Sequence, residues 1–157
     1  MNTNIYVLYG SQTGNSEEIS KIIYKLLIEK GYNCKHSSLN NSIQNDTFNF
    51  IQDEKSTVII VCSTTGNGDS PESATYFWNK LKSRKQPKNL FNGVKYTILG
   101  LGDTNYDKFC YMGKNIDRRF NELGGERFIE LHCLDEAVNN EDTVDIFIDK
   151  ILKYFMK

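Results

Sequence analysis

The sequence lacks several features that mark specialised proteins. Only two of its 157 residues are proline, and its 19 basic and 20 acidic side chains leave a formal net charge of −1. Such a balance gives no overall attraction to nucleic acid or to an anionic membrane surface. No apolar run reaches the roughly 18 residues of a membrane span. No basic segment followed by an apolar stretch opens the chain, so we expect neither a signal peptide nor a membrane partner.

Cysteine is sparse and unpatterned. The four cysteines are Cys34, Cys62, Cys110 and Cys133, with no CxxC spacing and only two histidines to join them. This argues against a zinc site or a disulfide framework, and we expect no metal. Reduced thiols are the simpler interpretation, and they favour a cytoplasmic location.

Apolar residues follow two different periods along the chain. Strand-like runs occupy residues 5–9, 58–62 and 94–101, with weaker candidates at 32–39 and 127–131. Helical spacing is clear in Ile19, Ile23 and Leu27, and Gly31 is placed to end that helix. Further helices are predicted over 73–83, 110–123 and 141–155, with a poorly defined one within 40–56.

Strands that alternate with helices indicate one α/β domain over residues 1–157. We predict a doubly wound, five-stranded parallel sheet with helices on both faces, because crossover connections between parallel strands are right-handed. In such sheets ligands bind beyond the carboxyl ends of the strands, where the strand order reverses. The loops after the first, third and fourth strands are therefore the places to look for chemistry.

The first of these loops, residues 11–16 (SQTGNS), precedes a helix. A helix N-terminus binds anions through unpaired N–H groups, and Ser11, Thr13 and Ser16 add three hydroxyls. Gly14 lets the backbone approach closely. The loop has neither the lysine of a triphosphate loop nor the GxGxxG of a dinucleotide site, so it suits a terminal phosphate monoester. An ordinary helix cap would use the same residue types.

The second loop, residues 63–71, contains two glycines and two threonines and could wrap a flat ring. Gly66 matters most if the ring is a flavin. The radical form of a flavin carries a proton on N5, and a nearby carbonyl can accept its hydrogen bond after a peptide flip that glycine makes easy. A glycine-rich connector is the alternative interpretation.

The third loop, residues 101–110, carries Tyr106 near its centre. A tyrosine ring can stack on an isoalloxazine face, which contributes about 1 kcal/mol beyond area burial. Packing against its own neighbours is the commoner fate of a single tyrosine. Each loop is a weak signal alone, but the fold brings all three to one end of the sheet.

These loops also resemble a known family. The run SQTGNS is similar to the flavodoxin phosphate loop, and STTGNGD, GLGDTNYDKF and ELHCLDEA resemble the FMN domains of diflavin reductases. The likeness covers nearly the whole chain. FCYMGKNIDRRFNELGG is most similar to the methionine synthase reductases, and VCSTTGNGD also resembles the cytosolic diflavin reductases of iron–sulfur assembly. The microsomal reductases, which carry a membrane anchor, are a weaker match.

The resemblance implies a flavodoxin-like fold, FMN as cofactor and a set of binding residues, without a catalytic acid or base. The implied phosphate ligands are Ser11, Gln12, Thr13, Gly14, Asn15 and Ser16; the implied ring contacts are Ser63, Thr64, Thr65, Gly66, Asn67, Gly68, Leu101, Gly102, Asp103, Tyr106, Phe109 and Cys110, with Asp135 in the last loop. Many relatives have an aromatic residue at the position of Thr65. The resemblance therefore implies that Tyr106 alone stacks on the ring.

Acidic residues are concentrated in three segments near the predicted site. Residues 64–72, 102–107 and 132–145 hold 9 of the 20 acids and no lysine or arginine. We expect this acidic end to receive basic partners, steered by charge and weakened by salt. The same field would disfavour an anionic reduced flavin and make it a strong electron donor. A merely solubilising surface is the alternative.

The function that these observations favour is one-electron transfer through FMN. The resemblance implies an FAD/NADPH-binding reductase module as donor, in the same chain or separate, and a protein acceptor. A free-standing flavodoxin carrier and a flavin-dependent quinone reductase remain alternatives. A phosphorylation-receiver domain is excluded, because that site needs acidic residues where this chain has Gly10 and Ser63.

Overall fold

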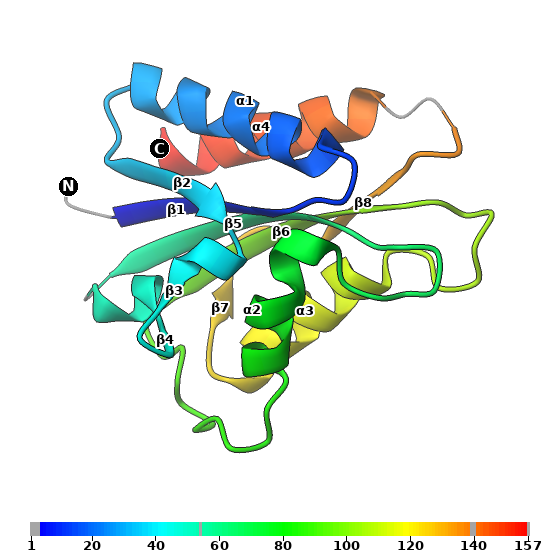
Figure 1. Ribbon diagram of the computed structural model, residues 1–157. Helices are drawn as coiled ribbons and strands as arrows, with labels where there is room; N and C mark the ends of the chain where they lie inside the picture. The colour runs from blue at the N-terminus through cyan, green and yellow to red at the C-terminus, as the bar shows by residue number, and fades with distance from the viewer. Residues whose placement is uncertain (1–3, 54, 139–140, 157) are drawn as a thin grey trace.

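A parallel sheet separates two helical layers in the computed structural model, which describes residues 4–53, 55–138 and 141–156 (Figure 1). The strand order is β2-β1-β5-β6, and both β7 and β8 pair with the far edge of β6. The strands are β1 (Asn4–Gly10), β2 (Cys34–Ser38), β5 (Ser56–Ser63), β6 (Lys95–Gly102), β7 (Glu126–Arg127) and β8 (His132–Asp135). The order reverses between β1 and β5, which confirms the predicted doubly wound sheet.

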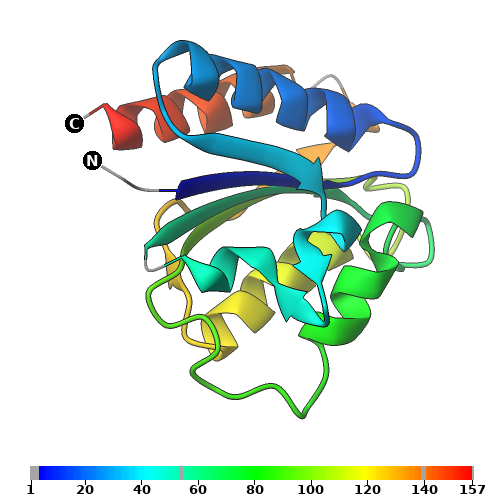
Figure 2. The same ribbon diagram turned by 60° about the vertical axis from the view of Figure 1, so that its left-hand side comes forward.

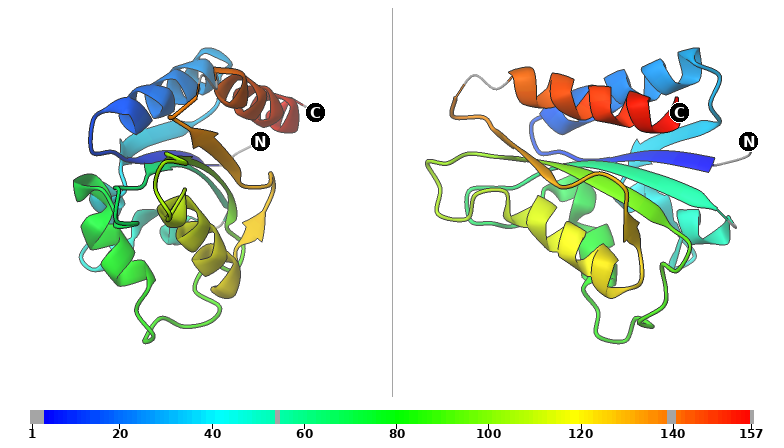
Figure 3. Two further views of the ribbon diagram at one scale, coloured as in Figure 1. Left: turned by 90° about the vertical axis from the view of Figure 1, so that its right-hand side faces the viewer. Right: turned by 180° about the vertical axis from the view of Figure 1, so that it is seen from behind.

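Helices cover both faces of the sheet, as Figures 2 and 3 show from three further directions. One face carries α1 (Asn15–Glu29) and α4 (Glu141–Phe155), and the other carries α2 (Thr75–Leu81) and α3 (Tyr111–Glu122). In the part of the chain that is described, none of these helices is both long and apolar enough to cross a membrane.

The central strands are apolar on both sides because both sides are covered. In β1, Ile5 and Val7 join the core under α1 and α4, whereas Tyr6 and Leu8 join the core under α2 and α3. The buried strand β5 alternates in the same way. The period of two along each strand therefore divides the core between the two layers.

Helix α3 lies unusually close to β6. A Cβ atom added to Gly113 in the helix would come within 2.9 Å of the Gly100 Cα atom in the strand. Only glycine permits this approach. The contact holds the start of α3, and thus the end of the third loop, tightly against the sheet.

The helix predicted within residues 40–56 is wrong. The chain instead forms η1 (Asn40–Ser42), a hairpin of β3 (Ile43–Gln44) and β4 (Thr47–Phe48), and η2 (Asn49–Gln52). Asn45 and Asp46 both have positive φ, 52° and 60°, as a two-residue hairpin turn requires. Asparagine and aspartate tolerate this conformation better than other non-glycine residues, and that signal was available in the sequence.

The fifth strand also differs from its prediction over 127–131. It is divided into β7 and β8, because Tyr96 pairs with Arg127 while Leu99 pairs with His132. Between these two pairs the chain advances three residues in β6 but five residues in the edge strand. The residues between β7 and β8 therefore do not pair with β6. An edge strand tolerates such an insertion because nothing pairs with its outer side. The helix predicted from residue 73 begins instead with η3 (Glu72–Ala74).

Candidate functional site

The loops after β1, β5 and β6 lie together at the carboxyl end of the sheet (Figures 1 and 3). Hydrogen bonds join them. The Ser11 N–H donates to the Ser73 hydroxyl at 2.8 Å, and the Thr64 N–H donates to the Leu101 carbonyl at 3.0 Å. Ser73 was not among the predicted site residues. Its position just before α2, where hydroxyl residues often cap a helix, was the signal in the sequence. The topology brings together the three segments that the sequence singled out.

The first loop is closed by its own side chain. The Ser11 hydroxyl accepts the Gly14 N–H at 2.7 Å, and Gly14 adopts a φ of +98° immediately before α1 begins at Asn15. Glycine is favoured at such a positive φ. The turn therefore leads directly into the N-terminal N–H groups of α1.

Ser16, in the first turn of α1, is fully buried, and its hydroxyl has no hydrogen-bond partner in the described structure. Leaving a buried hydroxyl unpaired costs about 1–3 kcal/mol. A phosphate held at the N-terminus of α1 would supply a strong acceptor for it. The residues of this loop therefore fit the phosphate of FMN.

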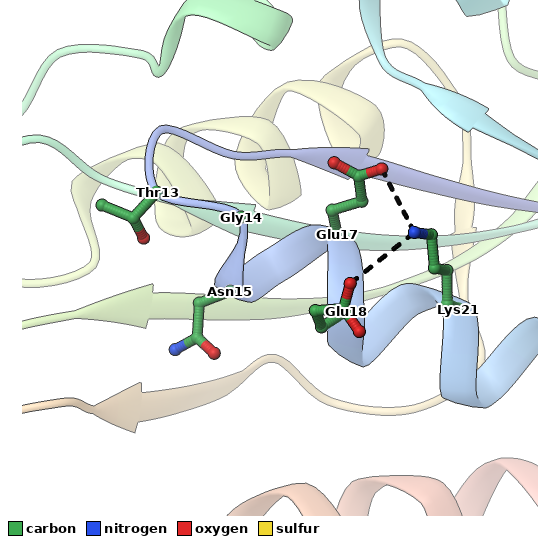
Figure 4. A pocket seen from close by; sticks show the side chains of 6 residues that line it. All are labelled: Thr13, Gly14, Asn15, Glu17, Glu18 and Lys21. Carbon is green, nitrogen blue, oxygen red and sulfur yellow. Dashed lines mark ion pairs between the residues drawn. The ribbon is translucent and has the colours of Figure 1, made fainter.

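A cavity of about 530 Å³ lies on the outer side of the same helix start (Figure 4). Its lining residues are Thr13, Gly14, Asn15, Glu17, Glu18 and Lys21. The Lys21 ammonium lies 3.6 Å from both glutamates, and Figure 4 shows Thr13 and Asn15 pointing away from this group. Two carboxylates and one ammonium make a poor anion site. The backbone and hydroxyls of the loop are the better place for a phosphate.

The second and third loops meet at a second cavity of about 510 Å³. It is lined by Gly66, Asn67, Asn105, Tyr106, Asp107 and Lys108. A Cβ atom on Gly66 would lie only 3.2 Å from the Tyr106 ring, so the two loops are in contact here. Tyr106 is still 53% exposed. Its ring can offer a surface to a flat ligand beside Gly66.

Other residues of the second loop hold its shape. Both the N–H and the hydroxyl of Thr65 donate to the Asp69 carbonyl, at 3.0 and 3.2 Å. The Thr64 hydroxyl accepts the Met112 N–H at 3.0 Å, and the Ser63 hydroxyl donates to the Gly10 carbonyl at 3.3 Å. Thr65 thus closes its own loop, whereas Thr64 ties the loop to the start of α3.

Lys108 places a cation next to the acidic segments 64–72 and 102–107. Gly68 has a φ of +83°, and a Cβ atom there would lie 2.5 Å from the Lys108 Cδ atom, so the lysine stem packs over the second loop. Lys108 follows directly after the acidic segment 102–107. The acidic end therefore has a basic residue beside the second cavity. Its position directly after residue 107 was the signal in the sequence.

Asp135, at the end of β8, orders the third loop. Its carboxylate accepts hydrogen bonds from the Thr104 hydroxyl at 2.6 Å, the Thr104 N–H at 3.1 Å and the Ala137 N–H at 3.0 Å. The Thr104 hydroxyl, more than the backbone donors, lowers the pKa of Asp135. Thr104 was not predicted, although a hydroxyl residue next to Asp103 in a turn was a usable signal.

Several other predicted residues act through the backbone or on neighbouring loops. The Gln12 side-chain oxygen accepts the Glu72 N–H at 3.1 Å, and the Asn15 amide donates to Glu136 at 2.8 Å. The Asp103 carboxylate accepts the Asn105 N–H at 2.8 Å. The first two contacts connect the loop at residues 11–16 to other segments, whereas the Asp103 contact shapes the third loop from within.

The last group of predicted residues lies at the end of β6 and directly over it. Leu101 is buried among the residues under α1 and α4, so its side chain faces the core. A Cβ atom on Gly102 would lie 2.7 Å from the Cys110 nitrogen and 3.1 Å from the Phe109 ring, which places these residues directly over the strand end. Cys110 is buried, and Phe109 is half-buried.

A hydroxyl-rich loop without lysine, at the switch point of a doubly wound sheet, defines an α/β protein that binds a phosphorylated cofactor in the flavodoxin manner. Comparison with known proteins agrees. The flavodoxin family model matches residues 7–148. The chain belongs to the flavodoxin family, whose members bind FMN, which confirms the predicted fold and cofactor.

Individual relatives are of two kinds. The chain is 33% identical to methionine synthase reductase from Mus musculus over 91% of its length, and 32% identical to NADPH-dependent diflavin oxidoreductase 1 from Schizosaccharomyces pombe over 81%. It spans only 20% and 21% of those proteins. A solved flavodoxin from Pseudomonas aeruginosa, a cysteine-to-alanine mutant, has a TM-score of 0.78 at 23% identity, with 98% of this chain and 99% of that chain covered.

Proposed function

We propose that this chain is an FMN-binding electron-transfer domain that passes single electrons to a protein acceptor. The observation that carries the proposal is the meeting of three loops at the switch point of a flavodoxin-family sheet, beside a buried hydroxyl that has no partner. FMN, when bound, supplies the ability to take and release electrons one at a time. The protein supplies binding, orientation and electrostatics.

The first loop holds the phosphate in this proposal. Its N–H groups and the hydroxyls of Ser11, Thr13 and Ser16 neutralise an anion without any basic side chain. The Ser11 hydroxyl can keep accepting the Gly14 N–H while it donates its own proton to the phosphate. Backbone groups and hydroxyls favour a phosphate monoester over a carboxylate because they surround several oxygens at once.

The second and third loops hold the ring. Gly66 presents its peptide without a side chain in the way, and Tyr106 offers a half-exposed ring beside it. The hydrogen bonds from Thr104 to the Asp135 carboxylate hold the third loop against the end of β8. The loops thus orient a flat ligand at the edge of the protein, where a partner can approach closely.

The electron source we propose is an FAD/NADPH-binding reductase module, in the same chain or separate. The names of the relatives, an NADPH-dependent diflavin oxidoreductase and a methionine synthase reductase, support this kind of donor. A free-standing flavodoxin-like carrier is the alternative, since the flavodoxin family model matches residues 7–148. The four free cysteines favour a reducing compartment such as the cytoplasm.

The phosphate assignment is tested by comparing FMN with riboflavin, which has the same ring but no phosphate. We expect quenching of flavin fluorescence by the apoprotein to give at least a tenfold lower Kd for FMN, equivalent to about 1.4 kcal/mol. Equal affinities would contradict the phosphate role of residues 11–16. Failure of both flavins to bind would contradict the proposed function as a whole.

The acceptor is proposed to dock at the acidic end through a basic face. Asp69, Asp103 and Asp107 lie on the second and third loops, and Lys108 reduces this negative field only in part. Stopped-flow transfer rates to a basic acceptor should fall steeply between low and high salt. A rate independent of ionic strength would contradict this docking mode, while leaving FMN binding intact.

A further inference from the structure

Two cysteines border the space left by the missing side chain of Gly100: Cys133 beside it in the sheet, and Cys110 above it at the start of α3. In the sheet register, Cys133 of β8 is the partner of Gly100. A Cβ atom on Gly100 would lie 3.3 Å from the Gly113 Cα atom, so this face of the two strands is directed toward α3. The Cys110 Sγ atom, just before α3, lies 3.4 Å from the position that a Cβ atom on Gly100 would occupy. Because Gly100 has no side chain, nothing on the strand separates the two thiols.

The two thiols interact directly, with opposite effects on their protonation. Interaction with Cys133, followed by burial, raises the pKa of Cys110, whereas interaction with Cys110 lowers the pKa of Cys133. The Lys114 ammonium also lowers the pKa of Cys133. Cys133 is half-buried and Cys110 fully buried. Cys133 is therefore the more accessible thiol of the pair and the one whose ionisation the surroundings favour, while Cys110 stays protonated more readily.

We propose that Cys110 and Cys133 form a reversible intramolecular disulfide when the protein is oxidised by hydrogen peroxide. The Cys133 thiolate attacks one peroxide oxygen, the O–O bond breaks, and Cys133 becomes a sulfenic acid while hydroxide takes up a proton to leave as water. Cys110 then attacks the Cys133 sulfur, the S–O bond breaks, and a second water leaves. Two thiols and one peroxide thus give one disulfide and two waters.

The other cysteines lack these properties. Cys62 of β5 flanks Gly100 on the opposite side, but it is fully buried, and burial raises its pKa to about 12. Cys34 belongs to the core on the other face of the sheet, and burial raises its pKa to about 12 as well. Neither presents a thiolate near neutral pH, so we expect oxidation to select the Cys110–Cys133 pair.

The disulfide would join the end of the third loop to the strand that leads into Asp135. It would therefore link two of the segments described above. A dithiol reductant would reverse it by thiol–disulfide exchange.

The test uses the full 157-residue chain, treated with stoichiometric hydrogen peroxide, quenched with catalase, denatured and labelled with a maleimide. We expect the wild-type protein to fall from four reactive thiols to two, and dithiothreitol to restore all four. The peptide that joins Cys110 to Cys133 should be about 2 Da lighter than the sum of its two reduced parts. This readout requires no flavin, so it stands or fails apart from the proposed function.

Matched variants separate this pair from the rest. Cys133→Ser should keep its three thiols through the treatment, whereas Cys34→Ser should fall from three to one; circular dichroism checks that both are folded. The Cys110→Ser variant should gain oxygen at Cys133 instead of a cross-link. Four thiols retained by the wild type, equal loss in Cys133→Ser, or a cross-link between another pair would overturn the proposal.

Discussion

Replacing Ser16 with alanine should lower the affinity for FMN without lowering the stability of the apoprotein. The Ser16 hydroxyl is fully buried and has no hydrogen-bond partner, so it contributes no bond that the apoprotein would lose. Its removal relieves part of the cost of about 1–3 kcal/mol for an unpaired buried hydroxyl. The melting temperature of the apoprotein should therefore stay constant or rise by a few degrees, at about 2–4 °C per kcal/mol for this size.

The effect of Ser16→Ala on FMN binding is opposite to its effect on apoprotein stability: the affinity falls. A hydrogen bond to a charged group contributes about 1.5–3 kcal/mol, which corresponds to a rise in Kd of about tenfold to a hundredfold. Riboflavin, which lacks the phosphate, should bind the variant and the wild type equally. The assay is fluorescence quenching of each flavin by apoprotein, together with thermal unfolding of the apoprotein.

Ser56 provides a matched control. It is the other buried hydroxyl without a partner in the described structure, and it begins β5 at the end of the sheet opposite the loops. Ser56→Ala should raise or preserve stability in the same way and leave the Kd for FMN unchanged. The reasoning would be refuted if Ser16→Ala bound FMN as the wild type does, or if it lowered apoprotein stability by more than 1 kcal/mol while Ser56→Ala did not.

Three further predictions concern electrostatics and the second loop. Asp117→Asn should lower the free energy of unfolding by about 1 kcal/mol, because it removes the charge and one of the two oxygens that accept 2.8 Å bonds from Arg127. Asp149→Asn, in an exposed pair, should change it by less than about 0.5 kcal/mol, and urea unfolding measures both. Burial lowers the pKa of His36 in the folded state. The stability that neutral His36 contributes is therefore present above pH 6.5 and is lost as the pH falls below that value. The melting temperature plotted against pH should be flatter for His36→Gln than for the wild type, and parallel curves would contradict this. Gly66→Ala should make a peptide flip costlier by about 0.5–1 kcal/mol. Its Cβ atom would lie 3.2 Å from the Tyr106 ring, so the ring must also shift slightly. The maximum of the long-wavelength band during flavin reduction should fall, and an unchanged maximum would argue against the flip.

The sequence predicted the parts of this fold that depend on long periodic patterns. The apolar runs of β1, β5 and β6 and the helical stripe of α1 each match the structure, because burial on both faces leaves a clear period. The loops at the carboxyl ends were found for the same reason. Once the strands are known to be parallel, their ends must meet.

The parts that were missed depend on short-range or long-range detail. Residues 40–56 contain few apolar positions, so no period decided between a helix and the hairpin that Asn45 and Asp46 form. The division of the fifth strand depends on its register against β6, which no local pattern reveals. The sequence shows Lys108 and Thr104 as residue types near the site, but their partners, Gly68 and Asp135, lie on other loops and are set only by the folded chain.

The most direct test of the account is the absorbance spectrum of the FMN-loaded protein during stepwise anaerobic reduction with dithionite. One-electron transfer predicts flavin bands near ~450 nm that decline while a long-wavelength band rises and then disappears. Bands that bleach in a single step, with no long-wavelength absorbance at any stage, would contradict single-electron transfer and favour a two-electron flavin enzyme.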